Sequence, residues 1–357
     1  MGQADADRSR GGIRGSGMTD VAVARSAERA PDVSRAAVRV LLDRVRELAL
    51  LPAIGVLLVV GIVSSPAFFT TSNFSNTAQG SAALGMVVVA ETLILLTGSF
   101  DLSLQSIYGL APLVGAWLIV AKDGHGLGTQ WSPAVGLLIV LALGGVVGLF
   151  NGLMIVKLRF NAFIFTLAML ILLAGIQQGI VSGQSAYNMP HSFVYLGSVY
   201  WLGFPLSAWT TIAVFLISGL FLRYHRTGRA IYAIGGNLEA PRAAGIKIDR
   251  IRIGVFCAAG VLAAIGGLMT AGQVLTVTAN QGNNLIFTVF AAAVIGGIAL
   301  EGGRGRMLGA FTGVVLLGMV NDVLVLRNTS TFWIDAVNGA IILIALALAR
   351  AVGAVRT

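Results

Sequence analysis

The amino-acid sequence predicts an all-α polytopic membrane protein with about ten transmembrane helices. Of its 357 residues, 56% are hydrophobic and only 11% are charged, and the mean hydropathy is +0.86. The apolar residues gather in successive runs of about 17–22 residues, the length that a helix needs to cross a bilayer. This composition excludes an ordinary soluble enzyme.

Ten apolar runs are expected to span the membrane. In order along the chain they cover residues 48–65, 81–98, 103–121, 132–154, 162–182, 207–222, 253–272, 285–300, 306–326 and 332–350. The first run begins too late for an ordinary signal peptide, so we expect an uncleaved span. Within the fourth run, Gly144, Gly148 and Gly152 share one helical face. They predict close packing inside the bundle or, alternatively, at a subunit interface.

The distribution of positive charge predicts that both termini are cytoplasmic. With the amino terminus inside, 22 Lys and Arg residues fall in inner segments and only Lys122 and Arg327 fall outside. Basic residues concentrate on the cytoplasmic side of membrane proteins. The same bias explains the net charge of +9, so we expect no nucleic-acid partner. Residues 1–47 are expected to form a disordered cytoplasmic tail, and 351–357 a short cytoplasmic tail beyond the membrane domain of 48–350.

A hydrophilic island, residues 223–252, interrupts the apolar runs. It carries seven basic residues against two acidic ones and therefore marks the cytoplasmic face. Its centre, GGNLEAPRAAGI, predicts a short helix that Asn237 caps and Gly245 ends. Because proline is tolerated only in a first helical turn, this helix must begin close to Pro241. Such a helix is suited to docking against a partner.

Four stretches in order along the chain carry motifs. They are TGSFDLSLQSIYGLA (97–111), NGLMIVKLRFNAFIFTLAM (151–169), GRAIYAIGGNLEAPRAAGIKIDRIR (228–252) and VIGGIALEGGRGRMLGAFTG (294–313). Together they resemble the permease subunits of ribose-, xylose- and arabinose-type ATP-binding-cassette sugar importers. The resemblance implies a multi-pass protein of the bacterial inner membrane that forms the pathway for a pentose, hexose or polyol. It also implies that the chain is no enzyme and needs no cofactor.

The resemblance implies several partners for this permease domain. They are a cytoplasmic ABC ATPase, an extracytoplasmic sugar-binding protein, a second copy of the chain or a homologous permease, and membrane lipid. The sequence contains no G-x-x-x-x-G-K-[ST] phosphate loop, so ATP that energises transport must be hydrolysed by another chain. The island then corresponds to the family's coupling loop, whose small helix fits a groove on the ATPase. The matching residues are Asn237, Glu239, Ala240, Arg242, Gly245 and Ile246.

Three polar residues are candidates for a pathway or gating role. Glu91 falls inside an apolar run, where a carboxylate is costly unless it faces a polar cavity or a partner. It is suited either to accept hydrogen bonds from sugar hydroxyls or to make a structural contact. Asp101 and Ser103 occupy the turn before the third span. Both residue types favour helix N-caps, so capping and gating are both open for them.

Other classes of function are compatible with parts of the sequence. An importer permease for branched-chain amino acids or nucleosides would share the same architecture. A self-sufficient secondary carrier would use buried ionisable groups for ion coupling, but Glu91 is the main candidate and the basic island has no role there. A membrane-embedded enzyme is least compatible, because no catalytic constellation and no metal-ligand spacing is present.

Overall fold

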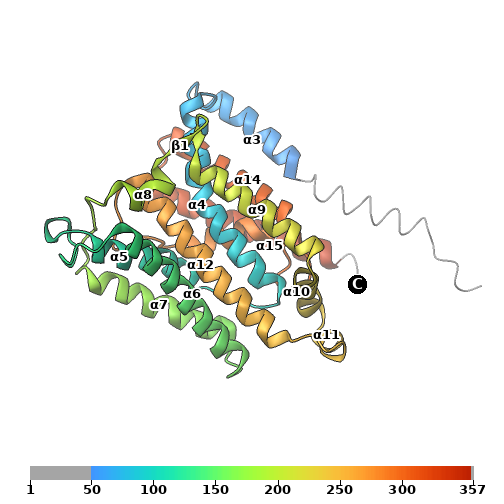
Figure 1. Cartoon of the computed structure of the whole chain (residues 1–357). Coiled ribbons are helices and arrows are strands. Elements are labelled where there is room, and N and C mark those ends of the chain that lie inside the picture. Colours follow the sequence, from blue (N-terminus) through green and yellow to red (C-terminus); the bar gives the residue numbers. More distant parts are fainter. Residues whose placement is uncertain (1–49, 355–357) are drawn as a thin grey trace, which may run out of the picture. The chain divides into compact units, whose positions relative to one another are not determined.

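The computed structural model describes residues 50–354, and about three quarters of them are helical (Figure 1). The predicted tail of 1–47 lies outside the described residues. The helices are α3 (Leu50–Ser64), α4 (Thr71–Leu96), α5 (Leu104–Ile119), α6 (Pro133–Val156), α7 (Ala162–Ile180), α8 (His191–Ser198), α9 (Leu206–Tyr224), α10 (Arg226–Gly236), α11 (Glu239–Ala243), α12 (Ile248–Val274), α13 (Leu285–Ile295), α14 (Met307–Leu326) and α15 (Thr331–Ala354). A 3-10 turn, η1 (Lys122–Gly124), and an antiparallel hairpin of β1 (Tyr200–Trp201) and β2 (Phe204–Pro205) complete the described elements.

Each of the ten predicted spans corresponds to one apolar helix of the described residues. Within residues 50–354, six helices are long and apolar enough to cross a membrane, namely α4, α6, α7, α9, α12 and α14. The helices α3, α5, α13 and α15 contribute shorter apolar stretches. The all-α polytopic class is therefore confirmed.

The start of α4 differs from the prediction by ten residues. Hydropathy places it at residue 81, but the helix begins at Thr71, in the polar sequence TSNFSNTAQG. Contacts with other helices satisfy these polar groups. The Asn73 side-chain amide donates to a carboxylate oxygen of Asp322 on α14 at 2.8 Å, and Gln79 donates to the Gly197 carbonyl at the end of α8. Because partners replace water here, a hydropathy criterion misses this segment.

The helix α4 forms the centre of the bundle. Of its most apolar window, 89% is buried, against 22–56% for the other candidate spans. The helix α12 packs against α4, α5, α6 and α8, and α9, α13 and α14 cover other sides of α4. Figure 1 shows α4 and α12 between the group of α5, α6 and α7 and the group of α9 and α14.

Small residues bring α6 and α12 into backbone contact. A Cβ atom added at Gly152 would lie 3.1 Å from the Ile253 Cα atom, and one added at Gly148 would lie 3.1 Å from the Cys257 Cα atom. A Cβ at Gly144 would meet the Gly260 carbonyl oxygen at 2.5 Å. The predicted glycine face therefore packs inside the bundle.

Successive loops lie at alternate ends of the bundle, as expected for a chain that crosses the membrane ten times. At the end that holds residues 223–252, here called the island end, the Gly303 amide donates to the Leu96 carbonyl at 3.1 Å. Lys157 forms an ion pair with Asp249 there at 2.6 Å. At the opposite end, Ala186 forms an isolated β-bridge with Val277. Loops that the sequence predicts on the same side thus contact one another, while the assignment of the island end to the cytoplasm stays a prediction.

Candidate functional site

The three candidate pathway residues meet in one buried polar cluster. We define this cluster as Glu91 of α4, Asp101 and Ser103 of the α4–α5 turn, Asn151 of α6 and Thr166 of α7. All five residues are 0% exposed. Glu91, Asn151 and Thr166 each lie within about five residues of a helix terminus at the island end, so the cluster sits just inside that end of the bundle.

Asp101 is the centre of the hydrogen bonds in the polar cluster. One carboxylate oxygen accepts from the Ser103 amide at 2.9 Å and from the Ser103 hydroxyl at 2.6 Å. The other accepts from the Asn151 side-chain amide at 3.3 Å, which also donates to the Ser103 hydroxyl at 2.8 Å. The Asp101 amide in turn donates to Glu91 Oε1 at 3.5 Å. Bonds to a charged acceptor are stronger than neutral ones, so Asp101 ties α6 to the α4–α5 turn.

The capping interpretation of Ser103 is wrong for its side chain. Ser103 stands at the N-cap position of α5, but its hydroxyl makes no bond to the helix. It donates to Asp101 instead. Asp101 accepts from the Ser103 amide, so it closes the turn before the helix and does not cap it. A buried carboxylate needs donors, and Ser103 supplies two.

The cluster keeps acceptor atoms without partners. Among the described residues, Glu91 Oε2 and Asn151 Oδ1 are buried and receive no hydrogen bond. Two carboxyl groups buried close together also disfavour each other's charged forms. Free acceptors of this kind fit hydroxyl donors, although the cluster is closed to solvent in this conformation. No group of three or more His, Cys, Asp or Glu side chains within residues 50–354 is placed to hold a metal ion.

The sequence reasoning missed three residues of this region. Asn151 and Thr166 lie in the second motif but carried no assigned role; the Thr166 hydroxyl accepts from the Leu102 amide at 3.1 Å. Arg252 counted only as a positive charge of the island. Its guanidinium donates to the Ser99 hydroxyl at 2.6 Å, which joins the first turns of α12 to the α4–α5 turn. The position of Asn151 at the head of the motif was the available signal.

The island forms the predicted short helix together with a second one. The helix α11 is one turn long, and Asn237 supports its start by accepting from the Glu239 amide at 2.8 Å. Leu238, and not Asn237, occupies the cap position. Gly245 ends the turn with a φ of +73°, and Pro241 lies in the first turn as required. The prediction overlooked α10, a longer helix that precedes α11.

The two helices of the island differ in exposure. In α10, Ile231 and Ile234 are buried, and the hydroxyl of the half-buried Tyr232 donates to the Gly305 carbonyl at 3.0 Å. Burial raises the pKa of Tyr232. In and beside α11 the residues Glu239, Ala240, Arg242 and Gly245 are exposed. The first helix is therefore anchored to the bundle, and the second is exposed on its surface.

Comparison with known proteins defines the class of this membrane protein. A family model described as branched-chain amino acid transport system / permease component matches residues 73–346. The chain belongs to this family: it is a permease subunit of an ABC importer, a multi-pass protein of the bacterial inner membrane, and not an enzyme. Membership implies ATPase and binding-protein partners in general.

Curated relatives cover most of the chain. The ribose import permease protein RbsC of Escherichia coli (strain K12) is 33% identical over 300 residues, 82% of this chain and 91% of the relative. The autoinducer 2 import system permease protein LsrC of Klebsiella pneumoniae is 34% identical over 303 residues, 85% and 86% of the two chains. The L-arabinose ABC transporter permease protein AraH of Azospirillum brasilense is 32% identical over 281 residues, 79% and 80%. No solved structure matches.

Two substitutions in the polar cluster are expected to affect the free energy of unfolding differently. Asn151→Ala removes the donor to Asp101 and Ser103 and should lower the free energy of unfolding by about 1–3 kcal/mol. Glu91→Gln removes a buried carboxyl group that lies close to Asp101 and should leave stability unchanged or raised. Thermal unfolding in detergent, followed by exposure of the single Cys257, measures both. Asn280→Ala, at an exposed position, is the control, and an equal loss for Glu91→Gln and Asn151→Ala would contradict the charge argument.

Proposed function

We propose that this permease is the membrane-spanning subunit of an ATP-driven importer for a sugar, either a pentose, a hexose or a polyol. The observation that carries the proposal is the set of curated relatives, named for ribose, arabinose and autoinducer 2, that align over about four fifths of the chain or more. These names favour the sugar assignment over the branched-chain amino acids of the family description. The specific partners are a cytoplasmic ABC ATPase, an extracytoplasmic sugar-binding protein, and a second copy of the chain or a homologous permease.

The helix α11 is the proposed contact with the ATPase. The coupling residues are Asn237, Glu239, Ala240, Arg242, Gly245 and Ile246. Exposure of this single turn supports the proposal, and its small alanines leave it narrow enough to enter a groove. The helix α10, which packs on α9 and α4, precedes α11, and the α11–α12 loop follows it, so a push on α11 is transmitted to the bundle from both of its ends.

Arg252 is the proposed connection between the coupling turn and the pathway. It lies nine residues beyond the end of α11 and bonds to Ser99, two residues before Asp101. A displacement of the first turns of α12 therefore moves the α4–α5 turn and the polar cluster with it. Gating by Glu91, Asp101 and Ser103 follows, because the cluster joins α4, α6 and α7 only while its hydrogen bonds hold.

Transport by reconstituted proteoliposomes tests the assigned function. We expect uptake of a labelled sugar only when this chain, the ATPase and the binding protein whose genes neighbour its own, and ATP are all present. A panel of pentoses, hexoses and polyols identifies the substrate, and leucine and a nucleoside are the comparison solutes. Uptake by this chain alone would establish the secondary carrier, and uptake of leucine instead of sugars would establish the amino-acid importer.

Gly245→Val is predicted to uncouple ATP hydrolysis from transport. Valine at a φ of +73° is strained by about 1–2 kcal/mol, so the exit from α11 must change conformation. The sugar imported per ATP hydrolysed should fall by about tenfold, while membrane insertion is retained. Gly236→Val is the matched control, because Gly236 ends α10 with open space around it and without a left-handed φ. Equal ratios for the two variants would remove α11 from the coupling route.

The bond between Arg252 and Ser99 predicts a non-additive pair of substitutions. Arg252→Gln and Ser99→Ala should each lower the sugar imported per ATP, and the double variant should be no worse than the worse single one. Arg252→Lys keeps a cationic donor and should restore part of the coupling. Steady-state uptake and phosphate release in the same vesicles give the ratio. Full additivity, or normal coupling in Arg252→Gln, would show that the bond transmits nothing.

A further inference from the structure

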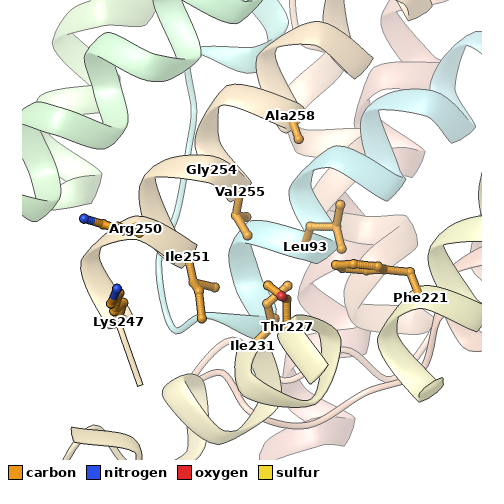
Figure 2. A pocket seen from close by; sticks show the side chains of 10 residues that line it. All are labelled: Leu93, Phe221, Thr227, Ile231, Lys247, Arg250, Ile251, Gly254, Val255 and Ala258. Carbon is orange, nitrogen blue, oxygen red and sulfur yellow. The ribbon is translucent and has the colours of Figure 1, made fainter. Parts of the chain in front are cut away.

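An apolar crevice opens between α9 and α12 near the island end. Its volume is about 290 Å³. Leu93 of α4 and Phe221 of α9 face Val255 and Ala258 of α12, and Ile231 of α10 closes the side toward the island (Figure 2). Both α9 and α12 pack on α4, so α4 forms the floor of the crevice. None of the residues that line the crevice belongs to the polar cluster, so the proposed gating gives the crevice no role.

The crevice extends from the island end into the hydrocarbon region of one membrane leaflet. Ala258 lies ten residues beyond Ile248, the first residue of α12, which is about 15 Å along the helix axis. The span predicted for this helix begins at residue 253, so the apolar lining reaches about 7.5 Å into the hydrocarbon region, as far as Ala258. Gly254 and Ala258 are exposed on this side of α12, so the crevice is open laterally. Hydrocarbon is the material that fits a laterally open, apolar space at this depth.

Two cations stand at the island side of the crevice. Lys247 and Arg250 line it and are exposed, and Figure 2 shows both at one edge, away from Phe221. Within the described part of the chain neither has an ion-pair partner, because the nearby Asp249 carboxylate binds Lys157 at 2.6 Å. Basic side chains at the end of an apolar cleft between membrane helices attract anionic lipid headgroups. A small soluble anion would satisfy the charges but not the apolar walls.

We propose that this crevice binds one anionic phospholipid from the leaflet on the island side. An acyl chain lies between α9 and α12, and the phosphate lies at Lys247 and Arg250. Ile231 of α10 and Ile251 of α12 both line the crevice, so the bound lipid braces the two helices on either side of α11. This site depends on no assumption about the transported sugar or about coupling.

Lipid binding by the purified full-length chain tests the site. Native mass spectrometry in detergent compares phosphatidylglycerol with phosphatidylcholine of the same acyl chains. We expect preferential binding of phosphatidylglycerol, and loss of about fivefold in its affinity for Lys247→Gln or Arg250→Gln and of about 30-fold for both together. The control is the double variant Arg223→Gln with Arg226→Gln, which removes the same charge from the island outside the crevice.

A second variant tests the apolar part of the site. Gly254→Leu places a side chain into the crevice from a position where an added Cβ meets no atom within 4 Å. It should abolish binding of both lipids without lowering the unfolding temperature of the delipidated chain. Gly175→Leu in α7, where an added Cβ is equally free, should change neither quantity.

Three results would overturn the proposal. Equal losses in the control double variant and in the Lys247 and Arg250 variants would show general attraction to the basic surface. Unchanged lipid binding in Gly254→Leu would exclude the crevice. If Lys247→Gln and Arg250→Gln bind lipid as the unsubstituted chain does but associate more weakly with the ATPase, these two residues belong to the contact with the ATPase. Because no sugar or ATP enters these assays, their failure is distinct from a failure of the proposed importer function.

Discussion

The backbone contact between α6 and α12 determines where the functional groups lie. Lipid surrounds a membrane helix with material as apolar as its own side chains, so helices associate through close packing and polar bonds instead of a hydrophobic driving force. Gly144, Gly148 and Gly152 permit that approach. The contact holds the last turns of α6, with Asn151, beside the first turns of α12, with Arg252. Both side chains reach the α4–α5 turn from there.

The polar cluster favours the conformation in which the helices are closed together at the island end. A carboxylate inside a membrane protein requires donors or a polar environment, and the central, buried position of α4 keeps Glu91 away from lipid. Ser103 donates to Asp101 within the same turn, but Asn151 can donate only while α6 stays beside the α4–α5 turn. Any conformation that separates these helices must supply water or a ligand hydroxyl instead. The hydrogen bonds that stabilise the closed end therefore also define what is needed to open it.

Sequence patterns predicted the local features and missed the long-range ones. Hydropathy located ten helices, and the identities of Asn237, Pro241 and Gly245 predicted the turn of α11, because both kinds of signal lie within one segment. The early start of α4 was missed since its polar residues find partners on α8 and α14, far away in sequence. The meeting of Asp101 with Asn151 depends on the packing of α6, which no spacing reveals. Candidate residues were thus found singly, and their assembly came from the structure.

The basic residues of the island have different structural roles, which their number alone does not reveal. Arg252 is directed inward to Ser99, and Arg229 donates to the Tyr224 carbonyl at 2.8 Å, so these two cations hold the ends of helices. Asp249 is occupied by Lys157, which leaves Lys247 and Arg250 exposed beside an apolar crevice. The positive-inside bias requires only that charge be present on this side of the membrane. Packing of the helices determines which basic residues form internal bonds and which stay exposed at the crevice. As a result, the proposed lipid contact lies within a few residues of the proposed ATPase contact.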